Sequence, residues 1–358
     1  MVDSTAADFR SDTVTRPSAA MLAAMTSAEV GDDVFGDDPS VEALEAETAE
    51  LLGKESALFV ASGTMSNQIA IMCHVGPLQE VLCDHRAHVH AWEAGGIHSL
   101  AGASVMAARP LGAAPFLCAE AVREYSRLDH CLHHQPVTKL LSLEHTQNGE
   151  VAPLSTLREC VAAARAMGIS THLDGARLWN AAAAEGLSPD TYAHLFDSVS
   201  VCLSKGLGAP IGSLLVGSAA FIQRARGYRK LLGGGWRQAG VLAAAGRHAI
   251  KEHRGRLVED HENASELAAG LRELGFSVRP PHTNMVWCSP PPDVDFAPIQ
   301  RALQMEGVLL GGAYTGPKCR NPFGDVAESL RVVTHLQTPR VACKRLISSL
   351  ARHLKKLR

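Results

Sequence analysis

The feature that most constrains this chain is an apolar run that ends at a lysine and passes into glycine, Val199-Ser200-Val201-Cys202-Leu203-Ser204-Lys205-Gly206. Apolar side chains alternate with small ones, a period of two that predicts a short buried β-strand. Because lysine is costly to bury, Lys205 at the end of such a strand either reaches into solvent or is held for chemistry. A desolvated lysine loses its proton more readily, and its neutral amine can form a Schiff base with an aldehyde. On this stretch alone, a lysine that reaches into solvent is the commoner arrangement.

The composition suits one large domain and a smaller one, with 358 residues of which 46% are hydrophobic. The formal net charge is −3 with histidine neutral, and no basic stripe indicates nucleic-acid binding. No apolar run approaches the roughly 20 residues of a membrane-spanning helix. We therefore expect a protein that acts on small molecules, with no nucleic-acid or membrane partner.

The nine cysteines are scattered along the chain, and none forms a Cys-x-x-Cys pair. This spacing favours a reducing compartment and argues against a disulfide framework or a zinc site. The first eight residues are acidic and lack the apolar core of a secretion signal. We therefore predict a cytoplasmic protein without a metal site.

Predicted strands alternate with predicted helices through most of the chain. The strands cover 57–60, 80–84, 139–144, 169–173, 199–203 and 213–216. The helices between them, one of which would open with a Thr156–Glu159 capping box, predict a mostly parallel sheet that binds ligands beyond the carboxyl ends of its strands. The last part of the chain carries short strands and an amphipathic terminal helix, typical of a small α+β domain. We predict an N-terminal segment, 1–18, a large domain, 19–245, and a small domain, 246–358.

Three features stand at the predicted carboxyl ends of strands. One strand runs into Gly63-Thr64, where a small-residue turn opens a helix whose free N–H groups and dipole favour an anion such as phosphate. Asp174 ends another strand, 31 residues before Lys205. A carboxylate beside a heterocyclic nitrogen, an amine near an aldehyde and a helix N-terminus for a phosphate are what pyridoxal phosphate requires. Together these features favour a chemical role for Lys205.

The sequence that carries these features resembles the L-threonine aldolases, a family that includes low-specificity and L-allo-threonine types. These proteins are fold-type-I pyridoxal-phosphate enzymes. The resemblance extends from residue 9 to about residue 337 and is carried by seven ordered runs: Arg10-Ser11-Asp12-Thr13-Val14-Thr15, Gly31-Asp32-Asp33-Val34-Phe35-Gly36, Ser62-Gly63-Thr64-Met65, Asp174-Gly175-Ala176-Arg177, Cys202-Leu203-Ser204-Lys205-Gly206-Leu207, Gly233-Gly234-Gly235-Trp236-Arg237-Gln238 and Leu330-Arg331-Val332-Val333-Thr334-His335. It implies an α/β fold, with a mostly parallel seven-stranded sheet in the large domain and a small C-terminal α+β domain. It also implies a homo-oligomer, a dimer of dimers, whose subunits share their active sites.

The resemblance implies a cofactor site for pyridoxal 5'-phosphate. Lys205 would bond covalently to the cofactor, and Asp174 would pair with its pyridine nitrogen. Gly63 and Thr64 would hold its phosphate. His88 would stack on the ring and lie near the substrate hydroxyl, which makes it the candidate base.

The resemblance also implies substrate contacts. Arg177 would lie near the phenolic oxygen of the cofactor and the substrate carboxylate. Arg331, together with Ser11, would clamp that carboxylate, since the planar fork of arginine matches a carboxylate bidentately. His134 matches a second active-site histidine of the family.

From the neighbouring subunit, the resemblance implies contributions from Lys230 and Arg237, with a solvated basic helix face as the alternative. Arg177 and Arg331 could likewise be surface ion-pair residues. Two stretches depart from the family pattern. Glu144-His145-Thr146-Gln147-Asn148 stands where the family often has Glu-Asn-Thr-His-Asn, and 314–328 is longer than usual.

The activity that the resemblance implies is retro-aldol cleavage of L-threonine, L-allo-threonine and related β-hydroxy-α-amino acids to glycine and an aldehyde, acetaldehyde in the case of threonine. Other classes remain open. The same cofactor supports β-elimination or transamination of an amino acid. A dinucleotide-dependent oxidoreductase could use Gly206-x-Gly208-x-x-x-Gly212, although this spacing departs from Gly-x-Gly-x-x-Gly. A cofactor-binding protein without activity is a further alternative.

Overall fold

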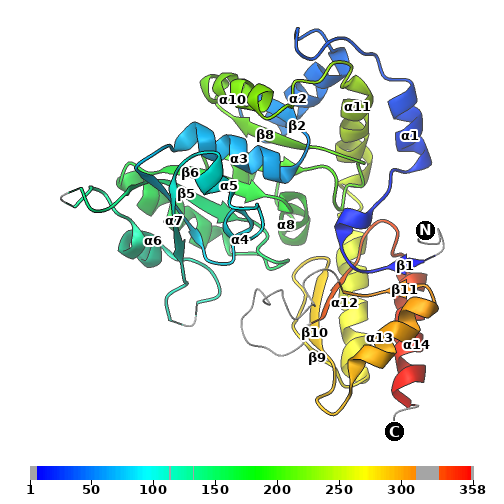
Figure 1. Ribbon diagram of the computed structural model, residues 1–358. Coiled ribbons are helices and arrows are strands. Elements are labelled where there is room, and N and C mark those ends of the chain that lie inside the picture. The colour runs from blue at the N-terminus through cyan, green and yellow to red at the C-terminus, as the bar shows by residue number, and fades with distance from the viewer. Residues whose placement is uncertain (1–5, 113, 132, 312–329, 356–358) are drawn as a thin grey trace.

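The computed structural model describes residues 6–112, 114–131, 133–311 and 330–355, so the loop predicted at 314–328 lies outside the described residues. The chain forms a large α/β part and a smaller part, which contains both the first strand, β1 (Ala7–Asp8), and the last helix, α14 (Arg340–Lys355) (Figure 1). In the described ranges, no helix is both long enough and apolar enough to cross a membrane.

Seven strands form the central sheet of the large part, in the order β2-β8-β7-β6-β5-β3-β4. Their bounds are β2 Ser56–Val60, β3 Gln79–Asp84, β4 Ser104–Ala108, β5 Val137–Glu144, β6 Ser170–Gly175, β7 Ser198–Cys202 and β8 Ser213–Gly217. Only β8 is antiparallel to its neighbours, β2 and β7, and every other pairing is parallel. The predicted fold class is therefore confirmed, and the carboxyl ends of β2, β3, β5, β6 and β7 meet at one edge of the sheet.

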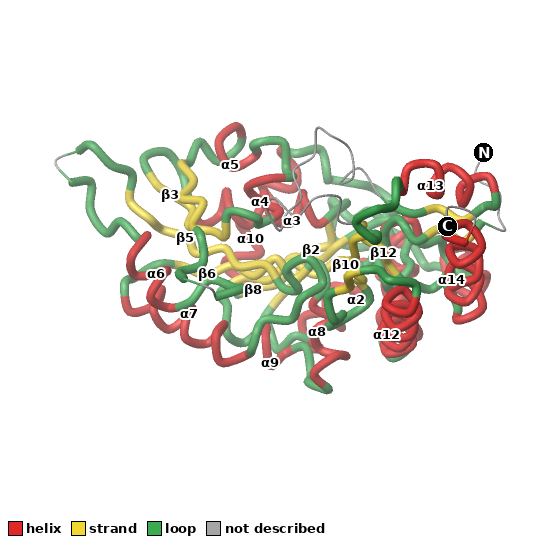
Figure 2. Tube along the Cα trace, turned by 90° about the horizontal axis from the view of Figure 1, so that it is seen from below, coloured by secondary structure: helices red, strands yellow, loops and turns green. Residues whose placement is uncertain are grey.

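Two layers of helices cover this sheet (Figure 2). Side chains alternate between its faces, so in β2 Leu58 and Val60 face one layer while Ala57 and Phe59 face the other. The first layer contains α3 (Gly63–His74), α5 (Gly96–Ser99) and α10 (Ala219–Leu231). The second contains α2 (Pro39–Leu51), α6 (Ala119–Tyr125), α7 (Leu154–Ala166), α8 (Leu178–Glu185), α9 (Asp190–Ala193) and α11 (Gly240–His248). Burial on both faces leaves little freedom for the strands to slip in register.

The start of α7 corrects one prediction. The helix begins at Leu154, its N-cap is Pro153, and no side chain caps it. The predicted Thr156–Glu159 capping box is therefore wrong. Pro153 has a φ of −53°, close to the helical value that its ring imposes, and this allows the helix to begin ahead of Thr156.

The smaller part has its own apolar core. Around it lie β9 (Ser277–Val278), β10 (Met285–Ser289), β12 (Leu330–Val333), α12 (Leu257–Glu273), α13 (Phe296–Met305) and α14 (Arg340–Lys355). The N-terminal segment joins this core, because β1 (Ala7–Asp8) pairs in parallel with β11 (Val308–Leu309) and Phe9 is fully buried. The segment then forms the 3-10 helix η1 (Asp12–Val14) and α1 (Ala19–Thr26). The domain limits at 18 and 245 stay predictions.

Candidate active site

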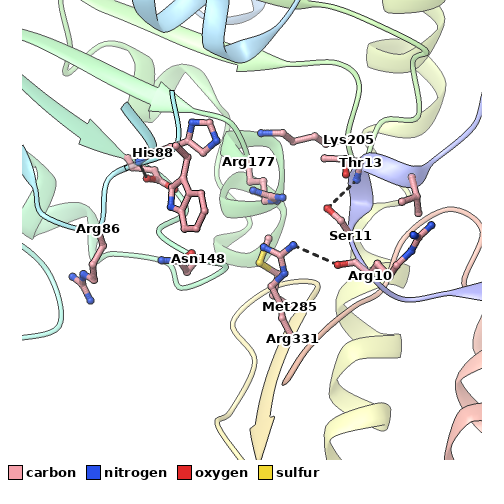
Figure 3. Close-up of a pocket in the computed structure, with 13 residues that line it drawn as sticks. Arg10, Ser11, Thr13, Arg86, His88, Asn148, Arg177, Lys205, Met285 and Arg331 are labelled. Atoms are coloured by element: carbon pink, nitrogen blue, oxygen red, sulfur yellow. Dashed lines mark hydrogen bonds between the residues drawn. The ribbon is translucent and has the colours of Figure 1, made fainter. Parts of the chain in front are cut away.

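A cavity of about 350 Å³ lies beyond the carboxyl edge of the sheet, where the large part meets the N-terminal segment and the smaller part. Its lining consists of Arg10, Ser11, Thr13, Val14, Arg86, His88, Trp92, Glu144, Asn148, Arg177, Lys205, Met285 and Arg331. Figure 3 shows the Lys205 side chain extending toward His88, with Arg177 beside them. The structure thus brings five of the predicted site residues together in one cavity: Ser11, His88, Arg177, Lys205 and Arg331.

Lys205 follows β7 and is half-buried. The Thr15 hydroxyl donates to the Lys205 carbonyl oxygen over 2.8 Å, which holds the end of this strand against the N-terminal segment. The glycines after it, Gly206, Gly208 and Gly212, lie in the connection between antiparallel β7 and β8, which the structure describes throughout and which contains no helix. The dinucleotide-binding alternative is therefore wrong, because that motif needs a glycine turn between a strand and a helix.

The turn after β2 has the geometry that the predicted anion site requires. Gly63 begins the 12-residue helix α3, which the Ser62 hydroxyl caps. The first N–H groups of a helix have no acceptor within it, so those of Gly63 and Thr64 can serve a bound anion. A Cβ on Gly63 would lie 2.8 Å from Cys202 Sγ at the end of β7, so glycine allows this helix end to approach the Lys205 strand.

Asp174 is buried near the end of β6, behind the residues that line the cavity. Its Oδ1 accepts from the Ala176 N–H over 3.1 Å, and its Oδ2 accepts from Asn67 Nδ2 over 2.8 Å. Asn67 Nδ2 also donates to Glu93 Oε1 over 2.9 Å, and that oxygen lies 2.8 Å from His88 Nδ1. Two intervening side chains therefore tie Asp174 to His88.

His88 begins the short helix α4 (His88–Ala91), and carboxylates surround it. Besides its contact with Glu93, its backbone N–H donates to Glu144 Oε2 over 2.8 Å. Burial alone would lower the pKa of His88, but the hydrogen bond to Glu93 and the charges of Asp174 and Glu144 outweigh it and raise that pKa. A neutral His88 that donates from Nδ1 keeps Nε2 as an acceptor, so it can remove a proton from a bound molecule.

Glu144 ends β5 and is the register partner of Asp174 on β6. Burial and the charge of Asp174 raise the pKa of Glu144 to about 7, although the His88 N–H and the charge of Arg177 oppose the shift. Two neighbouring carboxylates rarely ionise together in a buried site. The cavity therefore contains, besides His88, a second group that exchanges a proton near neutral pH.

A cluster of possible metal ligands occurs within the site. His88, Glu93 and Asp174 each offer a ligand atom, and these atoms lie within 4.8 Å of one another. Hydrogen bonds already connect them, directly or through Asn67. We therefore describe the group as a hydrogen-bonded network, and the absence of a metal stays a prediction.

Arg177 meets Asp12 of η1 in a bidentate ion pair, with Nε 2.8 Å from Oδ2 and Nη2 2.7 Å from Oδ1. Complete burial opposes the ionisation of Asp12, but the charges of Arg177, Lys205 and Arg331 outweigh it and hold the pKa of Asp12 well below its usual range. Asp12 occupies one edge of the guanidinium and so fixes the directions in which its three remaining N–H bonds point.

The predicted carboxylate clamp joins distant segments of the chain. Arg331 lies on β12, opposite Trp287 on β10, and its Nη2 donates to the Arg10 carbonyl oxygen over 3.4 Å. Next to Arg10, Ser11 Oγ accepts from the Thr13 N–H over 3.2 Å (Figure 3). The smaller part and the N-terminal segment therefore each bring one member of the clamp to the cavity.

Three predicted residues lie away from the cavity of their own chain. His134 is exposed on the loop between α6 and β5. Lys230 is exposed near the end of α10, and the exposed Arg237 forms an ion pair over 2.9 Å with Asp32. Arg229, beside Lys230, is buried in an ion pair, so α10 does not present a uniformly solvated basic face. The role of Lys230 and Arg237 in the site of a neighbouring subunit, and that of His134 as a second active-site histidine, stay predictions.

The residues present fit pyridoxal phosphate. Lys205 offers an amine at the cavity, Asp174 a buried carboxylate, and the N-terminus of α3 an anion site. Gly63 supports the same conclusion, because a larger residue there would force the anion site away from β7.

Comparisons with known proteins agree with this geometry. Residues 8–289 match the family model described as Beta-eliminating lyase. The chain is 42% identical over 333 residues to the Low specificity L-threonine aldolase of Escherichia coli (strain K12), with 93% of this chain and 95% of that protein covered. It is 42% identical over 314 residues to the Probable low-specificity L-threonine aldolase 2 of Arabidopsis thaliana, with 85% and 88% covered. A solved structure of Leishmania major threonine aldolase shares the fold, with a TM-score of 0.80 at 21% identity and 97% and 99% covered. The chain therefore belongs to the beta-eliminating lyase family and, within it, to the low-specificity L-threonine aldolases.

Proposed function

We propose that this chain is a pyridoxal-phosphate-dependent aldehyde-lyase that cleaves L-threonine, L-allo-threonine and related β-hydroxy-α-amino acids to glycine and an aldehyde. The observation that carries the proposal is the single cavity in which Lys205, His88, Arg177 and Arg331 meet. Relatives 42% identical to this chain, named for low-specificity L-threonine aldolase activity, support the same reaction.

Pyridoxal phosphate, when bound, supplies an aldehyde for an amine and a ring that takes up the electrons of a broken Cα–Cβ bond. In our assignment, Lys205 provides the covalent anchor and Asp174 keeps the ring nitrogen protonated. The N–H groups of Gly63 and Thr64 hold the phosphate, since the end of α3 favours an anion.

Arg331 and Ser11 bind the substrate carboxylate in this proposal. Arg177, whose orientation Asp12 fixes, supports that carboxylate and the phenolic oxygen of the ring. By fixing the carboxylate, Arg331 and Ser11 would set the orientation of the substrate Cα, and this orientation would favour cleavage of the Cα–Cβ bond over other reactions at that carbon.

His88 is our candidate for the base that removes the proton of the substrate β-hydroxyl. Glu93 holds the ring through Nδ1, which leaves Nε2 for this proton. Because its pKa is raised, His88 is a stronger base than an ordinary histidine once it is neutral.

We extend the proposal to assembly and location. Lys230 and Arg237 are exposed away from their own cavity, as residues that complete the site of a neighbouring subunit must be. We therefore propose a homo-oligomer, a dimer of dimers, with shared active sites. The scattered cysteines, which favour a reducing compartment, support a cytoplasmic location.

A product assay tests the proposal. The purified protein is supplied with pyridoxal phosphate and then with L-threonine or L-allo-threonine, and acetaldehyde, glycine, ammonia and 2-oxo acids are measured. We expect equal amounts of acetaldehyde and glycine, no turnover in Lys205→Ala, and normal turnover in Lys251→Ala, a control at an exposed lysine on the large part. Ammonia with a 2-oxo acid would indicate β-elimination, and a new amino acid formed from an added 2-oxo acid would indicate transamination; either as the main activity contradicts the proposal.

A further inference from the structure

A chain of hydrogen bonds runs from the site into the interior of the large part. Its members are His88, Glu93, Asn67, His172, Ser198 and His74, and Asp174 joins it at Asn67. The fold explains the order: two turns of α3 separate Asn67 from His74, and these turns lie over β6 and β7. His172 and Ser198 are register partners on those two strands. All members except His88 and His74 are buried.

Asn67 sets the direction of the hydrogen bonds in this chain. Its Nδ2 lies 2.8 Å from Asp174 Oδ2 and 2.9 Å from Glu93 Oε1. Carboxylate oxygens accept hydrogen bonds, so the amide nitrogen, which donates, faces both of them. The amide oxygen then faces His172 Nε2 over 3.1 Å, and this nitrogen must carry the proton of the ring.

The remaining directions follow from that tautomer. His172 Nδ1 becomes an acceptor, so the Ser198 hydroxyl, 2.9 Å away, donates to it. The Ser198 oxygen then accepts from His74 Nε2, which lies 2.8 Å away. Burial lowers the pKa of His172 to about 3 and that of His74 to about 4, so both rings are neutral near pH 7.

We propose that Asn67 is a positioning residue that holds Asp174 and the Glu93–His88 pair in one arrangement, and that the His172–Ser198–His74 relay keeps its amide from turning over. A reversed amide would place its oxygen against two carboxylates and its nitrogen against a ring N–H. The Asn67 side chain thereby fixes both Asp174 and His88, the two groups that we assign to the cofactor ring. The inference rests on the proposed function only where it assigns Asp174 and His88 to that ring.

The first test needs no cofactor. Two-bond ¹H–¹⁵N spectra distinguish the two neutral tautomers of histidine, and His172→Gln and His74→Gln assign the signals. Between pH 6 and 8 we expect His172 and His74 as neutral Nε2–H tautomers that do not titrate. A His172 ring protonated on Nδ1, or one that titrates in this range, would overturn the proposal.

The second test is the isosteric change Asn67→Asp. The titratable groups that face this position are Glu93, Asp174 and His172, with His88 and Glu144 beyond them. A carboxyl here must keep its proton to donate, and even then it serves only one of the two carboxylates. We expect the Kd for pyridoxal phosphate, measured by absorbance, to rise about tenfold at pH 8, and to rise less at pH 6 where the proton is retained.

The matched control for this test is Gln68→Glu, the same chemical change at the next residue. Gln68 donates to Glu93 but has no hydrogen bond to Asp174 among the described residues. We expect its Kd to rise less than in Asn67→Asp, because the change disturbs Glu93 alone and leaves the hydrogen bonds of Asp174 in place. Unchanged affinity in Asn67→Asp at pH 8, or an equal loss in both variants, would contradict the proposal. Because cofactor affinity is measured without threonine, this test does not depend on whether the protein catalyses the proposed reaction. The product assay tests that reaction separately.

Discussion

The two halves of the cavity are built in different ways. On the half to which we assign the cofactor, three buried residues of the large part lie behind the cavity lining, and one of them, Asn67, donates hydrogen bonds to both Asp174 and Glu93. On the substrate half, Ser11 comes from the N-terminal segment and Arg331 from the smaller part. The first half forms when one core packs, whereas the second depends on how separate parts of the chain meet. Substitutions in the first half should therefore change the binding or the absorbance of the cofactor, and substitutions in the second half should change substrate binding.

The largest effect is expected for Asp174→Asn. The side chain keeps its shape but loses the charge that holds a ring nitrogen protonated, so we expect kcat to fall by about 10²- to 10³-fold. The fall should come with a changed absorbance of the bound cofactor. Asp190→Asn, at a half-buried carboxylate on α9, is the control and should keep both properties. An active Asp174→Asn variant with an unchanged spectrum would remove Asp174 from the cofactor half.

Asp12→Asn tests the link between the two halves. It leaves the half-buried Arg177 without its bidentate, fully buried partner, and we expect the free energy of unfolding to fall by about 3 kcal/mol. Denaturant unfolding measures this, and KM for threonine should rise because Arg177 is no longer oriented. Asp8→Asn breaks a more exposed ion pair, with Arg10, and should cost less than about 1 kcal/mol. Equal losses in the two variants would show that the Asp12–Arg177 pair has no special role.

Glu144→Gln tests whether the carboxyl group of Glu144 titrates near neutral pH. The folded-state pKa of Glu144, about 7, is above its ordinary value of 4.5, so its contribution to stability is present below pH 4.5 and is lost as the pH rises through 7. The raised pKa of His88 acts in the same direction. Neutral buried histidines such as His74 and His172 act in the opposite direction in both proteins. The readout is therefore the difference in unfolding free energy between Glu144→Gln and the parent, which should shift in favour of Glu144→Gln as the pH rises from 5 to 8. Identical slopes for the two proteins would show that Glu144 does not titrate there.

The smallest effect is expected for His134→Ala. The ring is exposed on a loop, away from the cavity of its own chain, so we expect kcat/KM to change by less than about threefold. His88→Ala, measured beside it, should lose far more. A comparable loss in the two variants would indicate that His134 is a second active-site histidine, as the family resemblance implies.

Sequence patterns predicted the parts of the site that depend on local structure. Lys205, Asp174 and Gly63 stand at strand ends or helix starts, and period-two alternation places those positions at one edge of a parallel sheet. Asp12 and Arg177, in contrast, are 165 residues apart, and no local pattern pairs them. Asn67 follows the predicted anion turn, but its role depends on α3 crossing β6.

The raised pKa of Glu144 could not be predicted from the sequence either. It arises from burial and from the neighbouring Asp174, and both require the folded sheet. The start of α7 could not be predicted correctly from the sequence either. Thr156 and Glu159 have the spacing of a capping box, but the helix begins earlier, at Leu154, with Pro153 as its N-cap.

The most direct test of the account is to trap the bond between Lys205 and the cofactor. The protein, loaded with pyridoxal phosphate, is reduced with borohydride and digested, and the modified lysine is located by mass spectrometry. We predict one phosphopyridoxyl group, on Lys205, and none on Lys230, which we assign to the site of a neighbouring subunit as a non-covalent contact. Modification at another lysine, or its persistence at the same level in Lys205→Ala, would contradict the assignment of this cavity as the active site.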